Sequence, residues 1–367
     1  VITKLNRSLF RGNLVDCFAE RMSNMLTARQ ISILENIIHF FANTGEAVGS
    51  QTIAQQTDIE ASPATIRNEM KLLEEKGFIQ KNHLSSGRVP SMQGYRFYLD
   101  HIMQPEQPPQ DSIARIAQEL SKQFQELDDI VNQSAQILSD LTNYTAIVLG
   151  PKALESRLTD LKLVKVNANQ VMAIVETDGQ TIKSSVFRVG SRVSRSLIDR
   201  LSDLLKQELQ GLLLSQVHDK LDREIPFLVR RSLGDISSLL SPVINSIEQA
   251  GQNQVHISGK NKLFNFTEDL GIDQIKGLFD LFEDHEHDLS RLVNLADQGV
   301  NIRIGEELND ERFNNLSLIT VDYSVGNIGS GLIAILGPTN MPYSKTLGVI
   351  EGFKIELVEA LLNYYIH

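Results

Sequence analysis

One short segment, residues 62–71, carries side chains of the types that read DNA bases. Arginine pairs with guanine and asparagine with adenine through two hydrogen bonds each, and small methyl-bearing side chains contact the methyl group of thymine. These types occur together at a spacing that fits one face of a helix, in Ala64, Thr65, Arg67, Asn68 and Lys71, next to Ser62. The segment therefore predicts a helix that reads the major groove. The alternative is an ordinary solvent-exposed helix face.

Basic residues concentrate around this segment. Between residues 63 and 96, six basic side chains stand against three acidic ones, a local net charge of +3. The whole chain has 35 Lys plus Arg and 46 Asp plus Glu, a net charge of −11, which leaves −14 for the remainder. This balance excludes a protein that coats nucleic acid or anionic membrane along its whole surface, and favours one local phosphate-binding site.

Three other features have residue types used in catalysis or ligand binding. Residues 284–288, with the sequence DHEHD, resemble a set of metal ligands, but His285 continues an apolar helical stripe, which is typical of an acidic surface helix. The glycine-rich residues 326–331 precede a strand-like run instead of a helix, so they predict a turn and not a phosphate loop. A single cysteine, Cys17, excludes disulfides within the chain and fits a reducing, cytoplasmic compartment. We expect no cofactor, no metal and no enzymatic activity.

The size of the chain suits two or three domains, since it has 367 residues of which 41% are hydrophobic. Its longest apolar runs, such as residues 332–336, are about strand length and too short to span a membrane. No membrane partner is expected. Residues 1–24 are interpreted as a poorly specified extension.

Helix start and stop signals predict three short helices near the N-terminus. Thr27 and Gln30 form a capping box that begins the first helix, and Gly45 ends it. Ser50 is expected to cap the second. Ser62, followed by a proline, begins the third helix, which Gly77 ends.

A small β-ribbon is predicted to follow these helices. Residues 78–81 fit a strand, 85–87 a tight turn, and 88–89 a return strand, with Arg88 at the tip where it would meet phosphate or the minor groove. One more helix is expected after Ser91, before the prolines of residues 104–110 mark a domain boundary. Three helices followed by a ribbon are typical of a winged helix.

Residues 112–142 have apolar side chains in a seven-residue rhythm, which predicts one long helix packed along another helix. The partner is either a second subunit or the same chain. Beyond residue 143 the pattern indicates a mixed α+β region. Its expected strands are 145–149, 161–166, 171–176, 181–189, 254–258, 301–305, 316–323 and 331–336, and its expected helices are 194–222, 227–250, 273–296 and 346–365.

Four segments carry a resemblance to a known family: GEAVGSQTIA at 45–54, SPATIRNEMKLLEEKGFI at 62–79, SSGRVPSMQGYRFYLD at 85–100 and GPTNMPYSKT at 337–346. In these, the sequence resembles the HrcA family of heat-inducible transcription repressors. The resemblance implies an α+β multidomain protein with a winged helix-turn-helix, a GAF-like domain and an inserted dimerisation domain. The expected boundaries are 1–24 for the extension, 25–103 for the winged helix, 104–111 for a linker, 112–194 and 266–367 for the GAF-like domain, and 195–265 for the insertion.

The same resemblance implies the partners. The family represses chaperone operons by binding an inverted-repeat operator, CIRCE, as a homodimer. The chaperonin GroEL is expected to keep the repressor active until heat stress diverts the chaperonin to unfolded proteins. The residues expected to contact double-stranded DNA are Ser50, Ser62, Ala64, Thr65, Arg67, Asn68, Lys71, Lys81, Ser85, Ser86, Gly87 and Arg88. The alternative function is a winged-helix repressor whose GAF-like domain binds a small molecule.

Overall fold

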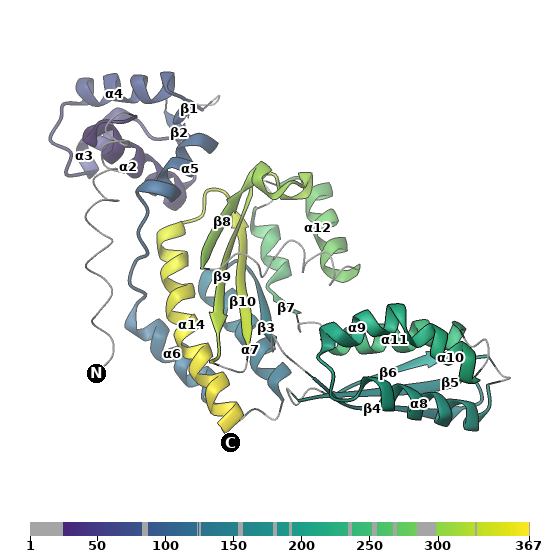
Figure 1. The fold of residues 1–367 in the computed structure, drawn as a ribbon. Helices are drawn as coiled ribbons and strands as arrows, with labels where there is room; N and C mark the ends of the chain where they lie inside the picture. The colour runs from purple at the N-terminus through teal and green to yellow at the C-terminus, as the bar shows by residue number, and fades with distance from the viewer. Residues whose placement is uncertain are drawn as a thin grey trace.

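The chain folds into three parts that follow one another across Figure 1: an N-terminal winged helix, a central α+β part and an inserted α+β unit. The computed structural model describes residues 25–366 except 83–86, 123, 125, 153–156, 179–181, 191–192, 234–236, 252–254, 267–269, 285–298 and 327–328. The fold class expected from the sequence, an α+β multidomain protein with an N-terminal winged helix, is confirmed.

The winged helix has three helices, a two-stranded ribbon and a fourth helix. Its elements are α2 (Ala28–Thr44), α3 (Ser50–Gln56), α4 (Pro63–Glu75), β1 (Ile79–Lys81), β2 (Arg88–Pro90) and α5 (Met92–His101). The capping box of α2 is formed by Thr27 and Gln30, and Gly45 ends the helix in the left-handed conformation with φ 69°. The prediction for Ser50 was wrong: Gly49 occupies the cap position of α3, and Ser50 lies buried in the first turn.

The central part is built on a five-stranded antiparallel sheet. The strand order is β7-β3-β10-β9-β8, formed by β3 (Thr145–Lys152), β7 (Val255–Ser258), β8 (Val300–Ile304), β9 (Leu316–Ser324) and β10 (Ser330–Pro338). The predicted turn at residues 326–331 lies between two paired strands, as expected, but Ser330 and Gly331 already belong to β10, and residues 327–328 lie outside the described part of the chain. One face of the sheet packs on α14 (Tyr343–Ile366) and its neighbours, and the other on η1 (Lys260–Phe266) and α12 (Ile272–Asp284).

The predicted long helix over 112–142 is two helices, α6 (Gln110–Leu120) and α7 (Leu127–Thr142). Both pack against α14 of the same chain, and Ile116, Leu120 and Ile130 are buried there. Of the two partners considered for the apolar stripe, the structure shows the one within the chain. The apolar stripe continues from α6 to α7 because both helices pack on α14.

The inserted unit lies between β3 and β7, two strands that pair with each other. It has a three-stranded sheet, β4 (Leu158–Asn167), β5 (Gln170–Thr177) and β6 (Ile182–Arg188), followed by α8 (Arg195–Leu209), α9 (Leu214–Arg223), α10 (Ile225–Leu233) and α11 (Ser237–Gly251). The unit has a hydrophobic core of its own.

The boundary predicted for the insertion, 195–265, differs from the structure. Leu163 and Val171 of the small sheet pack with Leu201 and Leu205 of α8, so β4–β6 belong with the helices that follow them and not with the five-stranded sheet. The expected single helix at 194–222 is also divided, because Gly211 adopts φ 82° between α8 and α9.

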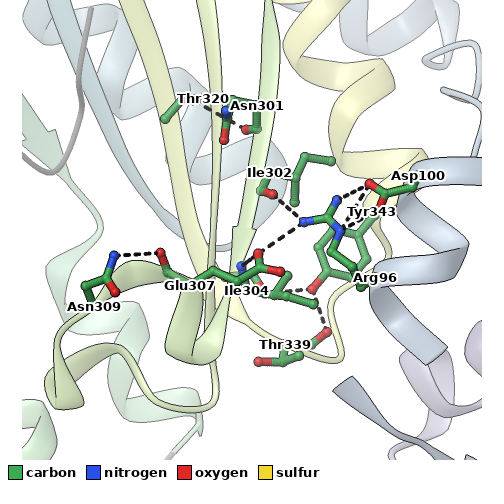
Figure 2. A network of polar contacts seen from close by, with 11 residues as sticks. Arg96, Asp100, Asn301, Ile302, Ile304, Glu307, Asn309, Thr320, Thr339 and Tyr343 are labelled. Atoms are coloured by element: carbon green, nitrogen blue, oxygen red, sulfur yellow. Dashed lines mark hydrogen bonds and ion pairs between the residues drawn. The ribbon is translucent and has the colours of Figure 1, made fainter. Parts of the chain in front are cut away.

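The winged helix is fastened to the central part by Arg96 of α5 (Figure 2). Its guanidinium donates to the carbonyl oxygen of Ile302 at 2.9 Å and to the carboxylate of Glu307 at 3.1 Å, while Asp100 holds it at 2.7 Å. Behind it, the rings of Tyr95 and Tyr343 meet edge to face with centroids 6.1 Å apart. Buried residues of the two parts form one continuous core.

Residues 110 and 111 of the predicted linker, 104–111, begin α6. The proline-rich residues 104–109 lie against the start of α14; we call this segment the strap. The backbone N–H of Glu106 donates to the carbonyl oxygen of Ser344 at 3.1 Å, and the Ser344 hydroxyl donates to the carbonyl oxygen of Gln104. A Cβ on Gly348 would lie only 1.9 Å from the carbonyl oxygen of Glu106. Glycine is therefore required for this close approach. The segment that joins the winged helix to the central part is held on α14 and is not a flexible linker.

Candidate nucleic-acid interface

Helix α4 lies along the outer edge of the winged helix, away from the central part (Figure 1). Ile66 and Leu73 are fully buried beneath it. Arg67, Asn68 and Lys71 are exposed on the other side, as the sequence pattern predicts. The helix thus presents an unobstructed polar face with the donors and acceptors that major-groove reading requires.

The N-terminus of α4 is fixed by its predicted cap. The Ser62 hydroxyl accepts from the backbone N–H of Thr65 at 3.2 Å and lies 2.9 Å from the Thr65 hydroxyl. Ala64 is exposed beside them. The cap holds the first turn rigidly and leaves a small side chain at the point where a helix approaches the bases.

The ribbon after α4 has a different geometry at Arg88 from the one predicted. Arg88 pairs with Lys81 in the β1–β2 ladder and is not at the tip. Its Nε and Nη2 atoms lie 2.9 and 2.8 Å from Oε2 of Glu74, and its side chain is 18% exposed. Arg88 is therefore bound within the protein. Lys81 is exposed and projects from the same ribbon.

The remaining predicted contact residues divide into two groups. Ser85 and Ser86 lie outside the residues that the structure describes. Gly87 and Ser50 are described, and both are buried. A Cβ on Gly87 would lie 2.8 Å from backbone and side-chain atoms of Ala47, so this glycine lets the ribbon cross the loop before α3.

Three of the six basic side chains counted in the sequence form hydrogen bonds within the protein, whereas Lys71 and Lys81 have only longer ion pairs, of 3.6 and 4.0 Å. Lys76 donates to the carbonyl oxygen of Met25 at 2.7 Å, Arg88 binds Glu74, and Arg96 binds at the domain junction. Arg67, Lys71 and Lys81 remain on the exposed face. Sequence reasoning missed the internal roles because partners such as Glu74 and Arg88 are 14 positions apart and no local spacing relates them.

The other chemistry considered from the sequence has no support in the described part of the chain. Within it, no group of three or more His, Cys, Asp or Glu side chains is arranged to hold a metal ion. Residues 285–288 of the DHEHD segment, and Cys17, lie outside it. None of the helices that the structure describes is long and apolar enough to cross a membrane.

A three-helix core, a β-ribbon and a capped, outward-facing third helix define a winged-helix DNA-binding protein. Family models agree over most of the chain: the winged helix-turn-helix transcription repressor, HrcA DNA-binding, matches residues 25–98, and the HrcA protein C terminal domain matches residues 128–347. The chain belongs to the HrcA family of heat-inducible transcription repressors. These proteins repress transcription and are not enzymes.

Relatives from several bacteria match nearly the full length. A heat-inducible transcription repressor HrcA from Tetragenococcus halophilus is 39% identical over 341 residues, which cover 93% of this chain and 98% of the relative. The repressors of the same name from Enterococcus faecalis and Bacillus pumilus are 38% and 39% identical, and each match covers 93% of this chain and 99% of the relative. A crystal structure of a hypothetical protein, 21% identical, aligns over 92% of this chain and 98% of that one with a TM-score of 0.54, which supports the fold.

Proposed function

We propose that this repressor binds an inverted-repeat operator of the CIRCE type as a homodimer, with α4 of each subunit in a major groove. The observation that carries the proposal is the exposed face of α4, where Arg67 and Asn68 stand clear of the protein above a buried apolar side. Two subunits related by a two-fold axis would present two such helices to two symmetric half-sites. Lys71 and Lys81, also exposed, would contact phosphates on either side.

The open face of the inserted sheet supports the homodimer. Val164, Met172 and Val186 lie side by side across β4, β5 and β6, on the face opposite the buried core of the unit. Val186 is 52% exposed, and the nearby Ile182 is 66% exposed. An antiparallel sheet that faces only water usually has polar side chains there, so this row fits a second copy of the same chain.

Modulation by the chaperonin GroEL belongs to the same proposal and is supported by family membership. Operator occupancy followed on a temperature ramp, with and without chaperonin, tests it. We expect occupancy to fall on heating and to recover on cooling only when chaperonin is present. Reversible recovery without chaperonin would contradict this part of the proposal.

A mobility-shift titration tests the DNA contacts. The protein should bind an inverted-repeat duplex much more tightly than a scrambled duplex, and Arg67→Ala or Asn68→Ala should lose about 1–3 kcal/mol of that discrimination. Lys81→Ala should weaken binding to both duplexes alike. Arg200→Ala, which removes an exposed arginine from α8 of the inserted unit, is the matched control and should change neither affinity. Equal affinity of the unmodified protein for both duplexes would refute the proposal.

A second candidate function, small-molecule sensing, is favoured by a cavity of about 210 Å³ at the junction of the winged helix and the central part. Burial raises the pKa of Tyr98 in its wall to about 12, so this phenol stays protonated, and its oxygen lies 3.2 Å from Nε2 of His39. A ligand here would touch both parts at once. Thermal-shift screening with small metabolites tests the idea, with Ala42→Phe to fill the cavity; a shift that survives this substitution would contradict it. The lining residues are Ile38, His39, Ala42, Asn43, Tyr98, Glu106, Met341, Pro342, Tyr343, Ser344 and Lys345.

A further inference from the structure

Glu74 lies in the last turn of α4 and turns both carboxylate oxygens toward the ribbon. Oε2 accepts from Nε of Arg88 at 2.9 Å and lies 2.8 Å from Nη2 of the same guanidinium. Oε1 lies 4.0 Å from Nζ of Lys81. One side chain of α4 therefore binds Arg88 of β2 directly and lies within ion-pair distance of Lys81 of β1.

Arg88 is fixed from its backbone as well as from its side chain. Its N–H and carbonyl oxygen form hydrogen bonds with the carbonyl oxygen and N–H of Val48, each 2.9 Å long. The side chains of Arg88 and Glu74 are 18% and 26% exposed, so their ion pair is shielded from water more than a surface pair. The loop before α3, the ribbon and α4 meet at this one pair.

A carboxylate at this place has a cost for DNA binding. The phosphate backbone repels a negative charge on the face that it approaches, and the effect is independent of base sequence. A glutamate that only occupied this surface would weaken every complex. Its contacts join α4 to the ribbon, the two elements that face the duplex in the proposed complex.

We infer that Glu74 is a positioning residue for operator recognition: it fixes the angle between the ribbon and α4, so that α4 enters the major groove in the orientation that the base contacts of Arg67 and Asn68 require while the ribbon rests on the DNA backbone. The inference rests on the proposed function. It adds a specificity role for an acidic residue that does not itself contact a base. The hydrogen-bonded arginine fork gives the pair a defined direction, which a lysine in place of Arg88 would not reproduce.

The test compares Glu74→Gln with Glu75→Gln in the full chain, each titrated with the operator duplex and with a scrambled duplex. Glu75 is the matched control because it is adjacent on α4 and pairs with Lys71 at 3.6 Å, without contact to the ribbon. Both variants lose one negative charge, so both should bind the scrambled duplex about two- to threefold more tightly. Only Glu74→Gln should lower the ratio of operator to scrambled affinity, by about tenfold.

Two further variants keep the test decisive. Arg88→Lys retains the charge and should lower the ratio as Glu74→Gln does, while the double variant Glu74→Arg, Arg88→Glu restores the pair in reverse and should recover most of it. An unchanged ratio in Glu74→Gln and Arg88→Lys, or an equal loss in Glu75→Gln, would overturn the inference. Failure of the proposed function has a separate signature, since Arg67→Ala would then leave the ratio unchanged whatever Glu74→Gln does.

Discussion

The contact between the strap and α14 predicts a specific sensitivity at Gly348. A Cβ at this position would stand 1.9 Å from the carbonyl oxygen of Glu106 and 2.9 Å from its carbonyl carbon. Atoms in van der Waals contact stand about 3.5 Å apart, so Gly348→Ala would push the strap outward by about 1.6 Å. Hydrogen bonds as long as the 3.1 Å bond from Glu106 to Ser344 do not survive such a displacement.

The expected cost follows from what the strap loses. Two hydrogen bonds contribute about 1 kcal/mol each, and the packing of Pro108 on Gly352 about 1 kcal/mol more. Alanine inside a helix offsets about 1 kcal/mol of this, because it is a better helix former than glycine. The free energy of unfolding should therefore fall by roughly 2 kcal/mol. For a unit of about 150–250 residues, the range that suits the winged helix and central part together, this lowers the melting temperature by about 4–8 °C.

Calorimetry and limited proteolysis check the prediction together. A glutamate-specific protease should cut the variant at Glu106 much faster than the unmodified protein, because a displaced strap exposes its backbone. Gly190→Ala is the matched control, since a Cβ there would have nothing within 4 Å. The reasoning is refuted if Gly348→Ala melts within about 1 °C of the unmodified protein and resists cleavage at Glu106 equally well.

Three further outcomes are expected. Ile66→Ala, at a fully buried position under α4, should lower the free energy of unfolding by about 2–4 kcal/mol in urea titrations, and an unchanged midpoint would contradict the packing described. The hydrogen bond from Lys206 lowers the pKa of Asp160 below 3.8, so this contact stabilises the fold above that pH and its contribution is lost as the pH falls through the folded-state pKa. Asp160→Asn should accordingly be less stable than the unmodified protein at about pH 6 and equal to it at about pH 2, whereas an equal deficit at both would argue against the assignment. Operator affinity should fall with salt with a log–log slope of about −5 to −9, for a dimer that engages six to ten phosphates; a slope near zero would exclude phosphate contacts as the main attraction.

The local features of the winged helix were predictable because local chemistry decides them. Thr27, Ser62 and Ser91 cap helices by hydrogen bonds to residues three positions away, and Gly45 ends one through its own backbone angle. Such signals depend on neighbours in the chain. The orientation of α4 was also predictable, since one apolar stripe suffices to turn Arg67, Asn68 and Lys71 outward; that they contact DNA stays a prediction.

Features that depend on distant partners were not predictable. The seven-residue spacing of apolar side chains over 112–142 arises because α6 and α7 both pack on α14. The spacing therefore continues through the residues between the two helices and gives no sign that the helix is interrupted there. Apolar and polar side chains alternate along β4–β6 as they would in a strand of either sheet. No local signal therefore assigns these strands to the core of the inserted unit. A count of charges likewise cannot separate Arg67, which is exposed, from Arg88, which Glu74 binds.

The strap and the shared core have a consequence for the spacing of the operator. A flexible linker of six residues has a root-mean-square end-to-end distance of about 13 Å, so it would let each winged helix shift by the length of roughly four base pairs. Here the strap is fastened to α14 and the winged helix shares its core with the central part, so this slack is absent. In the proposed dimer the distance and the orientation between the two α4 helices are then fixed. One base pair inserted between the half-sites rotates one of them by about 35°, and the protein would have to strain itself or the duplex to follow.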